Sequence, residues 1–241
     1  MKATIIVQAR TGSTRLPGKV LLKVLNKSVL EHLIERLMRA KAVDRIIVAT
    51  TIAQDDNKIV DLAAKMGISA YQGSEEDVLD RFYQTALQFG LKDIVRITAD
   101  CPLMDPSVID KGIECYFSSA TDYASNVLER TYPDGEDVEV FSFDALRRAW
   151  KETRLRSERE HVTLYVRKHP EKFKLTNFKN EINIADKRWT LDREEDFIFV
   201  KKVYEGLYPD KQYFGMEDIM NFLKNNPGTE EINKKWVKQY E

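Results

Sequence analysis

The chain has 241 residues with 38 basic and 39 acidic side chains, and this near balance predicts no nucleic-acid or membrane partner, although local basic sites for small anions remain allowed. Its two cysteines, Cys101 and Cys115, form no CxxC pair, which indicates a reducing compartment and no structural zinc. No apolar run approaches the roughly 20 residues of a membrane span, and Met1-Lys2 leads directly into a predicted strand without room for a signal peptide. We therefore expect a cytoplasmic protein that is long enough to bury one substantial core.

The first predicted strand ends in a loop rich in glycine and cations. Residues Ile5–Val7 form a β-branched run without polar alternation, as in a buried parallel strand. In the loop that follows, glycine lets backbone amides approach a ligand closely, and converging N–H groups suit phosphate oxygens. Arg10, Arg15 and Lys19 would neutralise a polyphosphate and its leaving group. The sequence therefore predicts a phosphate-binding loop, and the alternative is a basic turn that only reverses the chain.

Two common phosphate motifs do not match this loop. The Walker pattern needs four residues between its glycines and a Ser or Thr after its Lys, whereas five residues separate Gly12 from Gly18 and Val20 follows Lys19. A dinucleotide fingerprint would need Gly-x-Gly-x-x-Gly, which the sequence lacks here.

The next hundred residues alternate between amphipathic helices and strands. Ser28 is the predicted N-cap of the first helix. The alternation predicts right-handed crossovers and a doubly wound, mostly parallel α/β sheet. The predicted elements are a helix at Ser28–Ala42, a strand at Arg45–Thr50, a helix at Asp56–Met66, a strand at Ile68–Tyr71, a helix at Gly73–Gly90, a strand at Ile94–Thr98 and a helix from Asp105.

Asp100 follows the predicted strand Ile94–Thr98 directly. Open α/β sheets bind ligands beyond the carboxyl ends of their strands, so Asp100 should lie near the basic loop. Magnesium on a triphosphate needs one or two hard carboxylate ligands. The sequence therefore predicts Asp100 as a magnesium ligand, with a simple turn former as the alternative.

The rest of the chain departs from the simple alternation. Ser157 and Glu160 have the spacing of a capping box, and Asp192 closes a short predicted strand, where the alternative is a helix N-cap. The C-terminal helices are expected on the outside of the sheet. The predicted elements are strands at Tyr123–Val127 and Val138–Phe141 around a turn at Tyr132–Gly135, a helix at Phe143–Glu152, an edge strand at Phe173–Phe178, a strand at Arg188–Asp192, and helices at Met216–Leu223 and Glu230–Trp236.

Several of these segments together resemble one family. The run Gln-Ala-Arg-Thr-Gly-Ser-Thr-Arg-Leu-Pro-Gly-Lys at 8–19 resembles the N-terminal signature of the cytidylyltransferase superfamily that activates acidic sugars, and most closely the spore-coat polysaccharide biosynthesis protein F family. The resemblance continues through Gly-Ser-x-x-Asp-Val-Leu-x-Arg at 73–81, Asp-x-Pro-Leu at 100–103, and the segments 131–141, 156–163 and 189–196. Glu136 is a departure, because an apolar residue is expected at its position.

The resemblance implies a fold, a reaction and a set of site residues. The implied fold is a Rossmann-like nucleotidyltransferase sheet with a small inserted β-containing lobe, as one domain over residues 1–241. Its implied parts are a nucleotide-binding half at about 1–118, an acceptor-binding half at about 119–192 and C-terminal helices at about 193–241. The implied reaction transfers CMP from CTP to a sugar-like acceptor with release of pyrophosphate, in surface polysaccharide biosynthesis. The acceptor's identity and the oligomeric state stay open, although related families tend to form dimers, so that a homodimer is one expectation.

The residues expected to carry this reaction fall into four groups. Arg10, Lys19 and Asp100 are the catalytic candidates, and Mg²⁺ would lie between Asp100 and Asp192. The expected nucleotide-binding residues are Ala9, Arg10, Thr11, Gly12, Ser13, Arg15, Lys19, Ser74, Asp77, Arg81 and Ala99. The expected acceptor-binding residues are Arg130, Tyr132, Asp137, Glu139, Arg156, Glu158 and His161.

Some of these residues could instead have a purely structural role. Asp77 would also serve as an ordinary helix cap, and His161 as a packed, hydrogen-bonded histidine. Two rival functions remain. One rival is a glycosyltransferase of related architecture, but such enzymes usually hold their metal with Asp-x-Asp, a triplet that this sequence lacks. The other rival is a non-catalytic nucleotide-binding module, which would not explain why Asp100 and Asp192 both lie at the ends of predicted strands.

Overall fold

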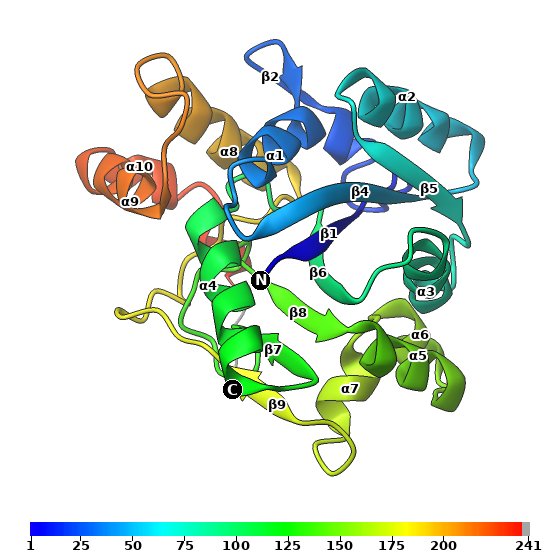
Figure 1. Cartoon of the computed structure of the whole chain (residues 1–241). Coiled ribbons are helices and arrows are strands. Elements are labelled where there is room, and N and C mark those ends of the chain that lie inside the picture. Colours follow the sequence, from blue (N-terminus) through cyan, green and yellow to red (C-terminus); the bar gives the residue numbers. More distant parts are fainter. Residues whose placement is uncertain (238–241) are drawn as a thin grey trace.

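A computed structural model describes residues 1–237 and places one seven-stranded sheet at the centre of the chain (Figure 1). The strands are β1 (Ala3–Gln8), β2 (Lys23–Val24), β3 (Lys27–Ser28), β4 (Val43–Thr51), β5 (Ser69–Gly73), β6 (Asp93–Thr98), β7 (Tyr123–Ser125), β8 (Glu139–Ser142) and β9 (Leu175–Asn177). Their order in the sheet is β5-β4-β1-β6-β8-β7-β9, with β2 and β3 forming a separate hairpin. The neighbouring strands β5, β4, β1 and β6 are parallel to one another. Strand β8 runs antiparallel to both β6 and β7. The predicted doubly wound, mostly parallel sheet is confirmed.

Helices cover both faces of this sheet. The α-helices are α1 (Val29–Leu37), α2 (Asn57–Lys65), α3 (Val78–Gln88), α4 (Pro106–Ser119), α5 (Phe143–Glu152), α6 (Arg156–Glu160), α7 (Leu164–Lys168), α8 (Glu194–Leu207), α9 (Met216–Asn225) and α10 (Pro227–Glu230). The 3-10 turns are η1 (Lys19–Leu21), η2 (Gln54–Asp56) and η3 (Lys234–Trp236). Helices α1, α2 and α4 pack on one face, and α3 and α5 pack on the other (Figure 1).

Strand β1 lies at the centre because its side chains suit burial on both faces. Ile5, Ile6 and Val7 are fully buried. Ile5 and Val7 join the core under α1, α2 and α4, whereas Ile6 joins the core under α3 and α5, as expected for side chains that alternate along a strand. The parallel register sets Gln8 beside Ala49 of β4 on one side and Thr98 of β6 on the other. The loops after these strands therefore meet at one edge of the sheet.

Two helix boundaries differ from the sequence prediction. Helix α1 starts at the predicted N-cap, where Ser28 and Glu31 form a capping box, but it ends at Leu37 rather than Ala42. The chain turns early because Ala42 accepts a hydrogen bond from the backbone of Ala3 and so starts the pairing of β4 with β1. Helix α3 begins at Val78, because residues 69–73 still belong to β5 and Asp77 is the N-cap.

The part of the chain after α4, up to β9, extends the same sheet. Strand β8 pairs with β6, which sets Glu139 opposite Arg96, and β7 then joins β8 to β9 at the sheet edge. The predicted edge strand is confirmed at Leu175–Asn177, and helix α5 has the predicted bounds.

The predicted capping box at Ser157 is wrong. Helix α6 has Leu155 at its N-cap position, and Ser157 lies inside the helix. Glu158 is buried and accepts a hydrogen bond from the hydroxyl of Thr153, which fixes the start of the helix from the preceding residues. The chain then breaks at Val162, whose positive φ of 43° separates α6 from α7.

The predicted strand at Arg188–Asp192 is also wrong. Only one isolated bridge, between Asp134 and Arg188, is formed there. The amide of Trp189 donates to the carbonyl of Asp134, and the amide of Leu191 donates to the carbonyl of Asp100. The segment is thus held by two loops rather than by a neighbouring strand.

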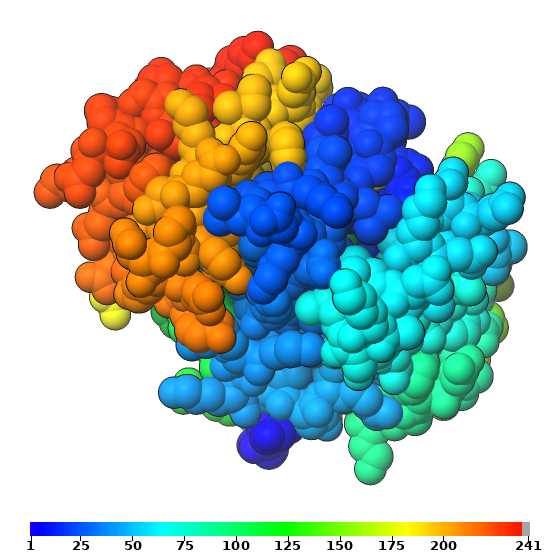
Figure 2. Space-filling model, turned by 90° about the horizontal axis from the view of Figure 1, so that it is seen from above, coloured from blue at the N-terminus to red at the C-terminus, as the bar shows by residue number. Residues whose placement is uncertain are grey.

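The C-terminal helices form a core of their own with Trp189. Helix α9 has nearly the predicted bounds, whereas the helix predicted at Glu230–Trp236 is split between α10 and η3. These helices pack on α8 rather than on the sheet. Helix α8 lies beside the N-terminal segment, where Lys27 donates to the hydroxyl of Tyr208 (Figure 2). Residues 238–241 of the expected C-terminal segment lie outside the described residues.

Candidate active site

The loop after β1 is anchored by Asp56, a residue that the sequence did not indicate as functional. The buried carboxylate of Asp56 accepts hydrogen bonds from the amide and hydroxyl of Thr11, at 2.8 and 2.6 Å. It also accepts bonds from Thr50 and Thr51 at the end of β4. Burial raises the pKa of Asp56, but these donors outweigh that effect and lower the pKa below its ordinary value. An ionised Asp56 therefore fixes the loop to the sheet edge.

Lys19 lies between the two predicted metal ligands. Its Nζ atom is 2.8 Å from Asp100 Oδ2, 2.8 Å from Asp192 Oδ1 and 2.8 Å from the carbonyl oxygen of Leu191. Arg15 pairs with the second oxygen of Asp192. Burial would lower the pKa of the Lys19 ammonium, but the two carboxylates raise it overall. Burial would likewise raise the pKa of Asp100, but the charge and hydrogen bond of Lys19 lower it.

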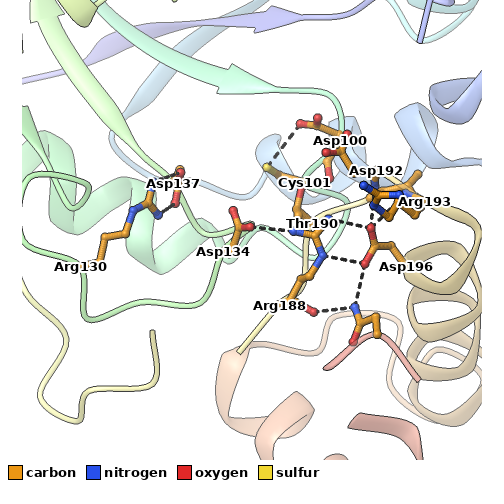
Figure 3. Close-up of polar contacts among 12 residues, drawn as sticks. Asp100, Cys101, Arg130, Asp134, Asp137, Arg188, Thr190, Asp192, Arg193 and Asp196 are labelled. Carbon is orange, nitrogen blue, oxygen red and sulfur yellow. Dashed lines mark hydrogen bonds and ion pairs between the residues drawn. The ribbon is translucent and has the colours of Figure 1, made fainter. Parts of the chain in front are cut away.

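The segment before α8 places Asp192 beside Asp100 (Figure 3). The amide of Leu191 and the hydroxyl of Thr190 both donate to the carbonyl oxygen of Asp100, at 2.7 and 3.1 Å. Asp192 is not the N-cap of α8, a position that Arg193 takes. The two carboxylates are thus joined through the backbone as well as through Lys19.

A buried ion-pair group supports this segment from below (Figure 3). Arg188 donates to both oxygens of Asp196, each at 2.8 Å, and to Asp134 at 3.0 Å. Asp196 in turn accepts from the amides of Asp192 and Arg193. Burial would lower the pKa of Arg188, but the bonds to Asp196 raise it.

In the described part of the chain, the side chains at this site supply only two carboxylate ligands for a divalent cation, those of Asp100 and Asp192. Within residues 1–237 no cluster of three or more His, Cys, Asp or Glu side chains is arranged to hold a metal. Asp100 and Asp192 nevertheless already hold one cation, the Lys19 ammonium, and the Leu191 carbonyl adds a third oxygen. Carboxylate and carbonyl oxygens are the ligands of hard divalent ions. The donor set therefore suits Mg²⁺, with further oxygens from phosphate and water.

A cavity of about 210 Å³ lies between the loop and these carboxylates. Of the residues predicted to bind nucleotide, Arg10, Ser13, Arg15, Lys19 and Ala99 line it. Ala9, Thr11 and Gly12 lie in the loop but do not line the cavity. Four further residues line it that the sequence did not single out, namely Gln8, Thr14, Val20 and Thr98.

The predicted base contacts lie beside the loop rather than in this cavity. Asp77 is the N-cap of α3, and Arg159 donates to its other oxygen. Ser74 accepts a hydrogen bond from the amide of Asp77, and its carbonyl accepts from Arg81 Nη1. Arg81 is fully buried, and its Nε and Nη2 atoms have no partner. Burial lowers the pKa of Arg81 to about 10, with a further lowering by Arg10.

A second cavity, of about 300 Å³, borders the same carboxylate pair. Of the residues predicted to bind the acceptor, Arg130, Asp137, Glu139 and His161 line it. Arg130 forms two hydrogen bonds with Asp137, at 2.7 and 2.8 Å (Figure 3). Residues that line it but were not singled out by the sequence are Arg96, Thr98, Cys101, Val127, Asp134, Arg167 and Thr190.

Three predicted acceptor residues do not reach this cavity. Tyr132 is buried and packs edge-on against Phe178 in the main core. Glu158 is buried against Thr153, and Arg156 is exposed at the start of α6. His161 at the C-terminal end of α6 lines the cavity, whereas Arg156 and Glu158 of the same helix do not.

Glu139 is the centre of a buried polar group in the second cavity. Its carboxylate pairs with Arg96, which also donates to Gln8, and it accepts from the hydroxyls of Tyr123 and Thr163. Burial raises the pKa of Glu139, but Arg96 and the other donors lower it to about 2. The two halves of the molecule are therefore linked by ionised, hydrogen-bonded side chains.

The two cavities share one wall. Thr98, Asp100 and Asp192 line both of them. A phosphate group in the loop cavity and a second molecule in the other cavity would meet at these carboxylates.

The comparisons with known proteins agree with this geometry. A family model described as cytidylyltransferase matches residues 4–224. The chain belongs to the cytidylyltransferase family. The spore coat polysaccharide biosynthesis protein SpsF of Bacillus subtilis is 32% identical over 231 residues, which cover 92% of this chain and 94% of that protein.

Two solved structures share the fold of this cytidylyltransferase. A cytidylyltransferase from Leptospira borgpetersenii has a TM-score of 0.90 and 31% identity, with 100% of this chain and 99% of that chain covered. A CMP:2-keto-3-deoxy-manno-octonic acid synthetase in complex with CTP has a TM-score of 0.68 and 18% identity, with 86% and 99% covered. The Rossmann-like fold, the family and the nucleotidyltransferase class expected from the sequence are thus confirmed. Among the described helices of the cytidylyltransferase, none is long and apolar enough to cross a membrane.

Proposed function

We propose that this cytidylyltransferase transfers CMP from CTP to a hydroxyl group of a sugar-like acceptor, such as an acidic sugar for a surface polysaccharide, and releases pyrophosphate. The observation that carries the proposal is the shared wall of the two cavities at Thr98, Asp100 and Asp192. In-line attack on the α-phosphate needs the acceptor and the leaving pyrophosphate on opposite sides of the phosphorus. A triphosphate in the loop cavity and an acceptor in the second cavity would approach each other at this wall, where such an attack would take place.

The loop cavity supplies positive charge for the triphosphate. Arg10, Arg15 and Lys19 line it from one side, together with the small residue Ser13. Cations that face a developing negative charge stabilise the transition state in a partly desolvated site. Arg10 and Lys19 would therefore stabilise the departing pyrophosphate.

Arg81 supports recognition of the cytosine base. Two of its nitrogen atoms, Nε and Nη2, are buried with no acceptor for their N–H groups, which is costly unless a ligand provides one. Cytosine presents a carbonyl oxygen and a ring nitrogen as adjacent acceptors. Arg10 and Glu75 form an ion pair at 3.9 Å and both shift the pKa of Arg81, so the guanidinium lies beside the nucleotide loop.

Asp100 and Asp192 would hold Mg²⁺. When bound, the ion would neutralise phosphate charge at the wall between the cavities. Asp56 keeps the loop in place for this step, because its carboxylate fixes Thr11 to the end of β4.

The second cavity suits an acceptor with hydroxyls and a negative charge. Its lining mixes acids with cations, and most of them already have partners within the protein. Arg167 lines it with a buried Nε atom that has no hydrogen-bond partner. Arg167 and the exposed His161 are therefore available to an acidic acceptor.

Pyrophosphate release tests this proposal directly. The protein is incubated with Mg²⁺, each of the four nucleoside triphosphates, and acidic sugars such as 3-deoxy-manno-octulosonate. We expect release with CTP only when an acceptor is present. Binding of CTP without release for any acceptor would support the non-catalytic module, and consumption of a nucleotide-sugar would support the glycosyltransferase.

An acceptor-side variant pair tests the second cavity. Arg167→Met removes a cation from its lining and should raise KM for an acidic acceptor, while KM for CTP stays unchanged. Arg156→Ala is the matched control, because Arg156 lies outside the cavity. Equal effects of both substitutions would contradict the assignment of this cavity.

A further inference from the structure

Lys19 holds a position that suits a metal ion. Its ammonium contacts three oxygens, from Asp100, Asp192 and the Leu191 backbone, each at 2.8 Å. We call these three oxygens the cation cage. Two carboxylates and a carbonyl are the donors that hard divalent cations use, so the oxygens that hold the ammonium could also bind such an ion.

The cage cannot hold both cations at once on the same oxygens. Lys19 is mostly buried and uses one oxygen of each carboxylate, while Arg15 pairs with the other oxygen of Asp192. A divalent ion that enters would lie next to the ammonium, and like charges repel strongly at such distances in a partly buried site. Lys19 has to leave before the metal can take these oxygens.

A route for Lys19 out of the cage lies in the neighbouring cavity. Lys19 starts η1 directly after Gly18, and its side chain lines the loop cavity together with Arg10 and Ser13. A polyphosphate in that cavity offers the ammonium a second anionic partner within the reach of a flexible side chain. Lys19 thus contacts both the cation cage and the space that the triphosphate would fill.

We propose that Lys19 is a resident counter-ion that keeps the cation cage closed to metal until nucleotide phosphates attract its ammonium away. The proposal rests on the proposed function, because it requires a triphosphate in the loop cavity. It assigns the Leu191 carbonyl as a third oxygen of the site, and it makes metal uptake dependent on the nucleotide. The nucleotide-free protein then carries no metal in the cage.

The size of the effect depends on the fraction of molecules in which the ammonium leaves the cage, and a fraction of about 1% sets the scale. An ammonium that fills the cage in all but about 1% of molecules weakens the apparent metal affinity about 100-fold. Replacement of Lys19 by an uncharged residue of similar length removes this competition.

Binding of Mn²⁺ to the nucleotide-free protein tests the proposal without any turnover. Free Mn²⁺ is measured by electron paramagnetic resonance during titration of wild type, Lys19→Met and the double variant Lys19→Met/Asp192→Asn. Lys27→Met is the matched control, because Lys27 pairs with Glu35 outside the site. We expect one bound Mn²⁺ in Lys19→Met, at least about 100-fold weaker binding in wild type and Lys27→Met, and loss of the site in the double variant.

Each other outcome overturns the proposal. Tight binding of one Mn²⁺ by nucleotide-free wild type would show that the ammonium does not exclude metal, and this result stands even if Lys19→Met fails to fold. Absence of binding in folded Lys19→Met would show that the cage does not take a divalent ion. The proposed function is tested separately by pyrophosphate release. If the protein releases pyrophosphate but nucleotide-free wild type binds Mn²⁺ tightly, only the cage proposal fails; if it releases none, the proposed function fails.

Discussion

The buried carboxylate of Glu139 should make the stability of this cytidylyltransferase depend on pH in a defined window. Glu139 pairs with Arg96 and accepts hydrogen bonds from Tyr123 and Thr163. These donors favour the ionised form over the protonated form. The perturbation is Glu139→Gln, which keeps the size of the side chain and removes its charge.

The magnitude follows from the pKa of Glu139. The folded state holds this pKa at about 2, compared with an ordinary value of 4.5. One unit is worth about 1.4 kcal/mol, so ionised Glu139 contributes about 3 kcal/mol to the free energy of unfolding. Because the folded pKa is depressed, this contribution is fully present above pH 4.5 and is lost as the pH falls toward 2.

The assay is urea unfolding of wild type and Glu139→Gln at several pH values between 7 and 3. We expect the variant to be less stable by about 3 kcal/mol at neutral pH, and the difference should shrink below pH 4.5. Glu129→Gln is the control, because Glu129 forms an exposed pair with Lys179, which is worth less than about 1 kcal/mol. A difference of the same size at every pH would refute the electrostatic explanation.

Three further substitutions test the supports of the site. Asp56→Asn leaves buried donors without a partner, at a cost of about 1–3 kcal/mol. Because the loop is then held less firmly, KM for CTP should rise about tenfold or more. An unchanged KM would mean that Asp56 does not position the loop. Arg81→Met removes a buried charge with unpartnered N–H groups together with the Nη1 bond to the Ser74 carbonyl. These two effects oppose each other, so unfolding in urea should show little change in stability while the preference for CTP over UTP is lost; retained selectivity would contradict its role at the base. Gly135→Ala sets a methyl group 2.7 Å from the amide nitrogen of Thr190 at a φ of 116°, and this strain should lower the melting temperature by several degrees, at a cost of about 1–3 kcal/mol. Gly228→Ala, which meets no atom within 4 Å, is its control, and equal melting temperatures would contradict the packing argument.

Much of the fold was predictable because local patterns and sheet topology agree. The apolar run at Ile5–Val7 has few alternatives to a central strand, and the alternation with amphipathic helices leaves a parallel sheet as the simple solution. Asp100 was predicted from its place after a strand, since the carboxyl ends of parallel strands meet at one edge. Asp192 was assigned through the family resemblance, because its segment has no regular structure that local patterns predict.

The missed residues have partners that are distant in the sequence. Asp56 appeared only as the start of a helix, although its main partner, Thr11, lies 45 residues earlier. Arg96 and Glu139 are 43 residues apart, and only the antiparallel pairing of β6 with β8 brings them together. Tyr132 was predicted to be in the site through the family resemblance of its segment, but its ring packs in the core. In each case the contact depends on how distant segments of the chain meet in the fold, which local sequence patterns do not indicate.

The position of Asp192 depends on helices that carry no proposed ligand. Asp196 in the first turn of α8 accepts from the amide of Asp192, and Arg188 binds Asp196 and Asp134 at the same time. Asn233, near the C-terminus, donates to Asp196 as well. Removal of one member of such a buried group leaves the others unpaired, which costs more than the loss of an exposed pair. The C-terminal helices therefore support the candidate active site through the backbone that holds Asp192, whereas Asp100 lies two residues after strand β6 of the sheet.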